Sequence, residues 1–171
     1  MRRGNPVRAG ARIAARWPAL AVAIVLGAAL LSPPVGATPA RCDIVGTAAG
    51  ERLVGTAGDD VICGMGGDDR LWGHGGDDTI IGGPGRDRIR GGMGEDHIAG
   101  GAGPDRIRGG PGGDRLYGGA GHDALRGQRG PDTLAAEDAT ETRDLVHAGP
   151  GDDVCVVDGG DILIGCETAI S

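Results

Sequence analysis

Hydrophobic and acidic residues recur with a period of nine along the middle of the chain. Cut every nine residues, residues 46–135 give ten units that all begin with Gly. The sixth position is Asp in nine units and Glu51 in the first, and the eighth position is always Leu or Ile. Because side chains alternate across a strand, positions seven to nine predict a short strand with its central aliphatic side chain pointing inward.

A single aliphatic side chain per unit cannot form a core unless the units stack. Stacking aligns these side chains into a continuous ladder, as in other repeat proteins. Glycines in the first five positions allow tight turns, because glycine reaches positive φ at little cost. We therefore expect an all-β fold, a right-handed parallel solenoid of nonapeptide repeats in which two units make one turn, with a loop at each edge.

The acidic residues of such a coil stack in two columns, one along each edge. One column contains Glu51, Asp69, Asp87, Asp105 and Asp123, and the other contains Asp60, Asp78, Asp96, Asp114 and Asp132. Carboxylates about 4.8 Å apart, the spacing of strands, repel one another strongly. Calcium relieves this repulsion with about six to eight oxygen ligands in flexible geometry, whereas magnesium demands an octahedron. Soft metals lack ligands, since the four His residues occupy different repeat positions.

Five units, which begin at Gly82, Gly91, Gly100, Gly109 and Gly118, match the pattern GGxGxDxUx in full. Residues 46–135 thereby resemble the calcium-binding repeats of RTX β-rolls. The resemblance implies that each ion lies between the loops of units i and i+2, held by backbone carbonyls and two sixth-position Asp residues. Ten units would give at most eight internal sites. Glu51 and Arg129 depart from the pattern, so the weaker sites are expected at the ends.

Residues 1–37 have the organisation of a secretory signal peptide. Five arginines precede an apolar stretch at residues 19–31, which is too short to span a bilayer comfortably as an anchor. Small residues end this segment, so cleavage is expected after Ala37, with Ala40 as the alternative. We therefore expect a secreted, extracellular bacterial protein without a membrane span after cleavage, whose residues 38–45 form an N-terminal cap.

Cleavage would leave a strongly acidic chain. All 17 basic residues are Arg, and five of them precede residue 38, so 12 Arg face 24 Asp and Glu and the net charge is −12. Such self-repulsion destabilises a compact state. Calcium would supply the missing positive charge, and folding is therefore expected to be coupled to calcium binding.

Residues 136–171 are interpreted as degenerate repeats and a C-terminal cap. Omitting residues 136–138 restores the period and puts Asp144 and Asp153 at the sixth position. Residues 139–147 lack the glycines needed to hold a metal, so a packing role is expected for them. The four Cys allow three disulfide connectivities, and proximity in sequence favours Cys42–Cys63 and Cys155–Cys166.

The sequence contains neither HExxH nor GxSxG, and the expected protein is a non-enzymatic, monomeric calcium binder. One sheet would carry seven arginines at its outward seventh and ninth positions: Arg52, Arg70, Arg88, Arg90, Arg106, Arg108 and Arg126. The alternative function is therefore an adhesive or cell-wall-interacting module that binds an anionic polymer. A solvated face that balances the acidic edges is the competing interpretation. Nucleic acid is not expected as a partner, because few aromatic residues accompany the arginines.

Overall fold

The computed structural model describes residues 41–136, 138 and 142–170. The predicted signal peptide and the first residues of the predicted N-terminal cap lie outside this part. All regular secondary structure in the described residues is β-strand. A membrane-spanning helix is accordingly not found among them.

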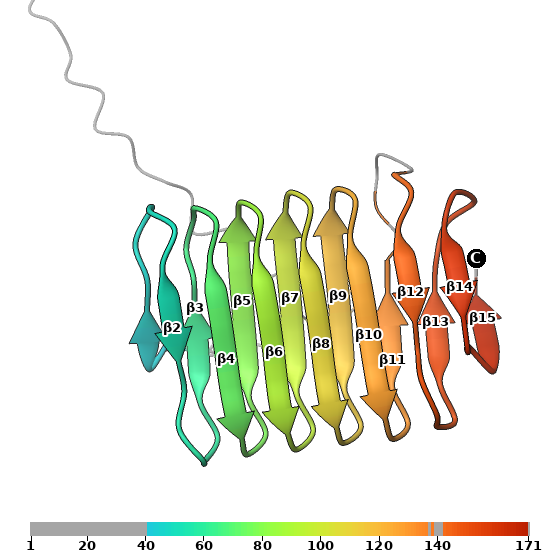
Figure 1. The fold of residues 1–171 in the computed structure, drawn as a ribbon, viewed down its shortest axis with the longest axis horizontal. Helices are drawn as coiled ribbons and strands as arrows, with labels where there is room; N and C mark the ends of the chain where they lie inside the picture. Colours follow the sequence, from blue (N-terminus) through green and yellow to red (C-terminus); the bar gives the residue numbers. More distant parts are fainter. Residues whose placement is uncertain (1–40, 137, 139–141, 171) are drawn as a thin grey trace, which may run out of the picture. The chain divides into compact units, whose positions relative to one another are not determined.

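The strands form two parallel sheets, and successive strands along the chain alternate between them (Figure 1). The eight-stranded sheet has the order β1 (Ile44–Val45), β3 (Val61–Cys63), β5 (Thr79–Pro84), β7 (His97–Ala102), β9 (Arg115–Ala120), β11 (Thr133–Ala135), β13 (Val154–Val156) and β15 (Thr168–Ile170). The seven-stranded sheet has the order β14 (Ile162–Ile164), β12 (Leu145–His147), β10 (Ala124–Arg129), β8 (Arg106–Pro111), β6 (Arg88–Met93), β4 (Arg70–Gly75) and β2 (Arg52–Val54). The prediction of an all-β solenoid with two nonapeptides per turn is confirmed.

The core is the ladder of eighth-position side chains between the two sheets. Neighbouring strands pair 18 residues apart, so that Ile80 faces Ile98 in one sheet and Ile89 faces Ile107 in the other. From Ile62 to Leu134 these side chains are at most 2% exposed, and they belong to one hydrophobic cluster. Each unit thus contributes one aliphatic residue to a core that extends along the whole repeat region.

The glycines serve two different purposes in the loops. From the third unit onward, those at the second and fourth positions have positive φ, such as 120° at both Gly101 and Gly103. Met65, His74 and Gln128 occupy the second position in their units and also have positive φ, between 77° and 91°. The glycines of the first position lie so close to carboxylate and carbonyl oxygens that a Cβ would have no room there.

Both sheets continue beyond Ala135, but the sequence separation between paired residues of neighbouring strands is no longer 18. Leu145 pairs with Ala124 and Val154 with Thr133, both at a separation of 21 residues, as three inserted residues require. The next strands, β14 and β15, pair at separations of 17 and 14 residues. The repeat phase is therefore kept in space although the loops change in length.

The two disulfides predicted from sequence proximity are present. Cys42 is joined to Cys63 and Cys155 to Cys166, with Cα–Cα distances of 5.9 and 6.0 Å. The first bond ties the segment before β1 to β3, and the second ties β13 to the segment before β15. Each bond thus fastens one end of the eight-stranded sheet.

Candidate metal centre

The sixth-position acids form two columns joined by hydrogen bonds. In each column the backbone N–H of one acid donates to a carboxylate oxygen of the acid one turn later, over 2.7–3.0 Å. Column one contains Glu51, Asp69, Asp87, Asp105, Asp123, Asp144 and Asp161. Column two contains Asp60, Asp78, Asp96, Asp114, Asp132, Asp153 and Glu167. This bond holds each carboxylate at the junction of loop and strand.

The second oxygen of these carboxylates is buried and accepts no hydrogen bond. This applies to the Oδ2 atoms of Asp69, Asp78, Asp87, Asp96, Asp105, Asp114, Asp123, Asp132, Asp144 and Asp153. Their side chains are at most 3% exposed. Buried polar atoms in native proteins almost always have a partner, so ten unpartnered oxygens in two columns fit coordination of a cation.

The space around these oxygens excludes any side chain on the adjacent glycine. A Cβ at Gly73, Gly82 or Gly100 would come within 3.0 Å of the Oδ2 of its own unit and of the carbonyl oxygen of the first glycine one turn later. Carboxylate and carbonyl oxygens therefore converge beside each first-position glycine. This explains why the first position is Gly in every one of the ten units.

Burial raises the pKa of the ten carboxyls that carry an unpartnered Oδ2. Loss of solvent is the largest cause; the hydrogen bond from the backbone N–H lowers the pKa, and neighbouring carboxylates raise it further. The pKa reaches about 8 at Asp105 and about 7 at Asp114 and Asp144. It is about 6 at Asp78, Asp87, Asp123 and Asp132. Without a cation, the fold thus disfavours the charged state that Asp normally has at neutral pH.

The arrangement suits a hard cation that takes oxygen ligands. Within the described ranges, no three His, Cys, Asp or Glu side chains are grouped as a metal site. Any ion would therefore combine few carboxylates with several backbone carbonyls, a ligand set that calcium accepts in flexible geometry.

Comparison with protein families agrees with this geometry. The model of the RTX calcium-binding nonapeptide repeat matches four times, at residues 45–80, 72–107, 100–134 and 138–165. The chain belongs to the RTX calcium-binding repeat family. A search of curated proteins gave no match. RTX repeats bind calcium, and the stacked Asp residues of this RTX solenoid fit that property.

Of the nine Asp residues predicted as ligands, Asp60 differs from the rest. Its Oδ2 accepts hydrogen bonds from the backbone N–H and the hydroxyl of Thr56, at 2.6 and 2.9 Å. A similar bond joins the N–H of Thr47 to Glu51 over 2.6 Å. In the first two units, a Thr at the second position thus supplies the partner that the later Asp residues lack.

Two residues with the same geometry lie outside the predicted ligand set. Asp144 and Asp153 are each 1% exposed, and both have an unpartnered Oδ2. The repeat phase puts both at the sixth position, but the missing glycines of residues 139–147 predict only a packing role for the unit of Asp144. The backbone N–H groups of Asp123 and Asp132 donate to these two carboxylates, so the irregular loops still present them to the same columns.

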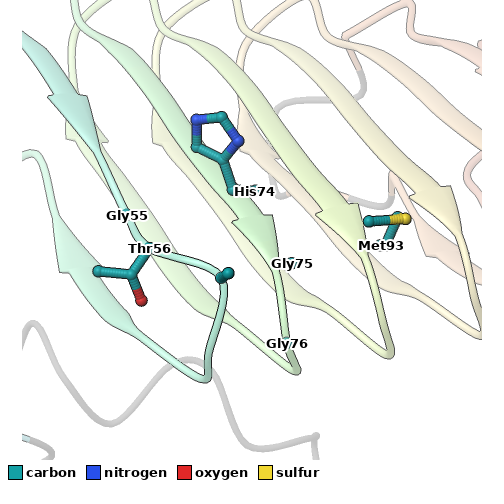
Figure 2. Close-up of a pocket in the computed structure, with 7 residues that line it drawn as sticks. Gly55, Thr56, His74, Gly75, Gly76 and Met93 are labelled. Carbon is teal, nitrogen blue, oxygen red and sulfur yellow. The ribbon is translucent and has the colours of Figure 1, made fainter.

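A separate hollow of about 390 Å³ lies near the loops that follow β2 and β4. It is lined by Gly55, Thr56, Ala57, His74, Gly75, Gly76 and Met93 (Figure 2). The His74 ring stacks on Trp72 with ring centres 3.7 Å apart, and the Thr56 hydroxyl bonds to Asp60. The lining supplies one imidazole and no carboxylate.

Proposed function

We propose that this RTX protein is an exported, non-enzymatic calcium binder whose solenoid folds as calcium fills the two acidic columns. The observation that supports it is the set of ten buried Oδ2 atoms without a hydrogen-bond partner. A cation between successive turns would give these atoms the partner they lack, and it would offset the repulsion along each column.

The ligands of each ion would be two sixth-position carboxylates one turn apart together with loop carbonyls. Asp87 with Asp105 and Asp96 with Asp114 are central examples. Calcium bound there supplies positive charge to buried oxygens, which removes the penalty that raises their pKa. Because the unfolded chain does not hold these oxygens together, the free energy of binding becomes free energy of folding.

Export is supported by the predicted signal peptide and by the disulfides. Disulfides persist in oxidising compartments outside the cytosol, and all four Cys of this chain are paired. Calcium sites of extracellular modules bind in the range of about 10⁻⁴–10⁻³ M, which suits an ion-rich exterior.

Circular dichroism during a calcium titration of the disulfide-bonded protein tests this function. We expect little β signal in excess chelator at pH 7.5 and a cooperative rise as calcium is added. Magnesium is the matched control, and it should be much less effective because it demands octahedral geometry. A full β signal in chelator at this pH, or equal effects of the two ions, would contradict the proposal.

A further inference from the structure

Seven arginines form two rows on the outer face of the seven-stranded sheet. Strand pairing aligns Arg52, Arg70, Arg88 and Arg106 in the first row. It aligns Arg90, Arg108 and Arg126 in the second. We call this surface the arginine face. Neighbours within a row are about 4.8 Å apart, and the rows, two residues apart along each strand, are separated by about 6.6 Å.

The arginine face is exposed and its charges are unbalanced. All seven side chains are exposed, and none of them forms an ion pair with a described residue. The corresponding positions of the eight-stranded sheet are mostly neutral, for example Thr79, Ile81, Ala99 and Tyr117. The positive charge is therefore concentrated on one of the two sheets.

Such rows weaken the sheet that carries them. Like charges directly opposite each other on neighbouring strands are destabilising, and here the same charge recurs on up to four consecutive strands. Neutral residues at the same positions of the other sheet show that the repeat does not require arginine there. An anion that spans several strands would offset this repulsion between arginines by its attraction to each of them.

We propose that the arginine face binds a linear acidic polysaccharide that carries one carboxylate per sugar. Guanidinium groups bind carboxylates through two parallel hydrogen bonds. The rows follow the direction in which strands stack, so an extended chain along them meets a new arginine at every strand. This function lies beyond calcium binding, although it requires the folded solenoid.

Two features favour a narrow sugar chain over nucleic acid. Trp72, which stacks on His74, and His147 are the aromatic residues aligned with the rows in the described part of this sheet, and they lie on the well-separated strands β4 and β12. Binding of single-stranded nucleic acid relies on an aromatic side chain for successive bases. In addition, exposed Asp59, Asp77 and Glu95 occupy the loops after β2, β4 and β6. Their charges repel a wide polyanion and confine a narrow one to the rows.

Binding of a fluorescent oligogalacturonate to the calcium-loaded, disulfide-bonded protein tests the proposal. The calcium concentration is kept the same in all arms, because the oligomer also binds calcium. We expect binding that weakens with added NaCl. Replacing Arg88, Arg90, Arg106 and Arg108 by Ser should lower the affinity at least about tenfold, since four exposed ion pairs contribute a few tenths of a kcal/mol or more each.

The matched control replaces two arginines outside the face by Ser, Arg41 before β1 and Arg115 on β9 of the other sheet, and is compared with the double variant Arg90→Ser with Arg108→Ser. The two double variants change the net charge equally, and the control should lower the affinity no more than about twofold, because its charges lie outside the rows and are screened by salt. Equal losses in both variants, or no binding by the unaltered protein, would overturn the proposal. So would tighter binding of DNA of equal charge, which would identify nucleic acid as the partner.

Circular dichroism of each variant in calcium shows whether weaker binding comes from removal of the arginines or from unfolding of the solenoid. If the fourfold variant does not fold, the double variant Arg90→Ser with Arg108→Ser removes most of one row and carries the same test, against Arg41→Ser with Arg115→Ser. An unaltered protein that folds with calcium but does not bind the oligomer would refute this inference and leave the calcium function intact.

Discussion

The two oxygens of each sixth-position carboxylate have different roles. In Asp105, one oxygen accepts the N–H of Asp87 at 2.8 Å, while the other is buried without a partner. The first oxygen fixes the geometry of the backbone, and the second is available to a cation. Substitutions that keep the first and remove the charge of the second can therefore separate folding from binding.

Asp105→Asn should reduce calcium binding without breaking the column. The amide oxygen can still accept the N–H of Asp87, but a neutral NH₂ replaces the free oxygen. We expect about one or two fewer ions per chain, because each carboxylate borders two gaps, together with a more stable metal-free form. Ion stoichiometry by elemental analysis and unfolding in chelator measure the two effects.

Asp152→Asn is the control for Asp105→Asn. Asp152 is exposed and lies outside the columns, and its substitution changes the net charge equally. An unchanged ion count in Asp105→Asn, or an equal loss in Asp152→Asn, would show that the column does not hold the ions.

Gly101→Ala should destabilise the calcium-loaded solenoid by about 1–3 kcal/mol or more, the cost of a strained backbone. Gly101 has a φ of 120°, and a Cβ there would collide with the carbonyl oxygen of Gly83. Gly58→Ala is the control, because a Cβ at Gly58 meets nothing within 4 Å. Urea unfolding in saturating calcium compares them, and equal midpoints would argue against the loop geometry.

At the scale of strands, the regular repeats could be predicted and the ends could not. The invariant aliphatic position fixed the phase of every strand from Arg52 to Ala135, because only one alternation buries Leu or Ile. The residues before β1 and β15 contain no repeated glycines, so periodicity could not place these two strands, whereas it did predict a partial strand at residues 161–164, where β14 lies. The hydrogen bonds of Thr47 and Thr56 to the first two acids could not be predicted either, because they depend on how the loop brings the second position close to the sixth.

Each disulfide stabilises the strands at one end of the solenoid. Replacing Cys155 and Cys166 by Ala should increase hydrogen exchange in β13 and β15 and leave β6 to β9 unchanged. Closing a loop of this size contributes about 3 kcal/mol in the chain-entropy view. Replacing Cys42 and Cys63 is the reciprocal control, with faster exchange at β1 and β3. Uniform acceleration along the solenoid would contradict local fastening.

At the scale of the whole molecule, the buried carboxyls link folding to pH. Their pKa values in the metal-free solenoid, about 6 to about 8 at seven positions, exceed the value of about 3.9 for Asp in unfolded chains. The folded state therefore binds more protons than the unfolded state between these values. The stability that these protonated carboxyls contribute to the metal-free fold is fully present below about pH 4. It is lost as the pH rises towards about 8 and the carboxyls ionise.

We accordingly expect acidification to promote the β signal of the metal-free protein. In chelator, circular dichroism should show more β structure at pH 5 than at pH 8. With calcium the dependence should reverse, because protons compete with the ion for the same oxygens. A metal-free β signal that grows from pH 5 to pH 8 would disagree with the burial of uncompensated carboxylates.

The hydrogen bonds that run along each column have a further consequence for how the ions load. Every interior carboxylate is positioned by the turn before it and stands next to the turn after it, so occupancy of one gap prepares its neighbours. The molecule then behaves as a one-dimensional lattice with nearest-neighbour coupling. A substitution at Asp105, near the middle, divides that lattice into two short segments, so that binding rises less steeply with calcium concentration. A substitution at Asp153, near one end, only shortens the lattice.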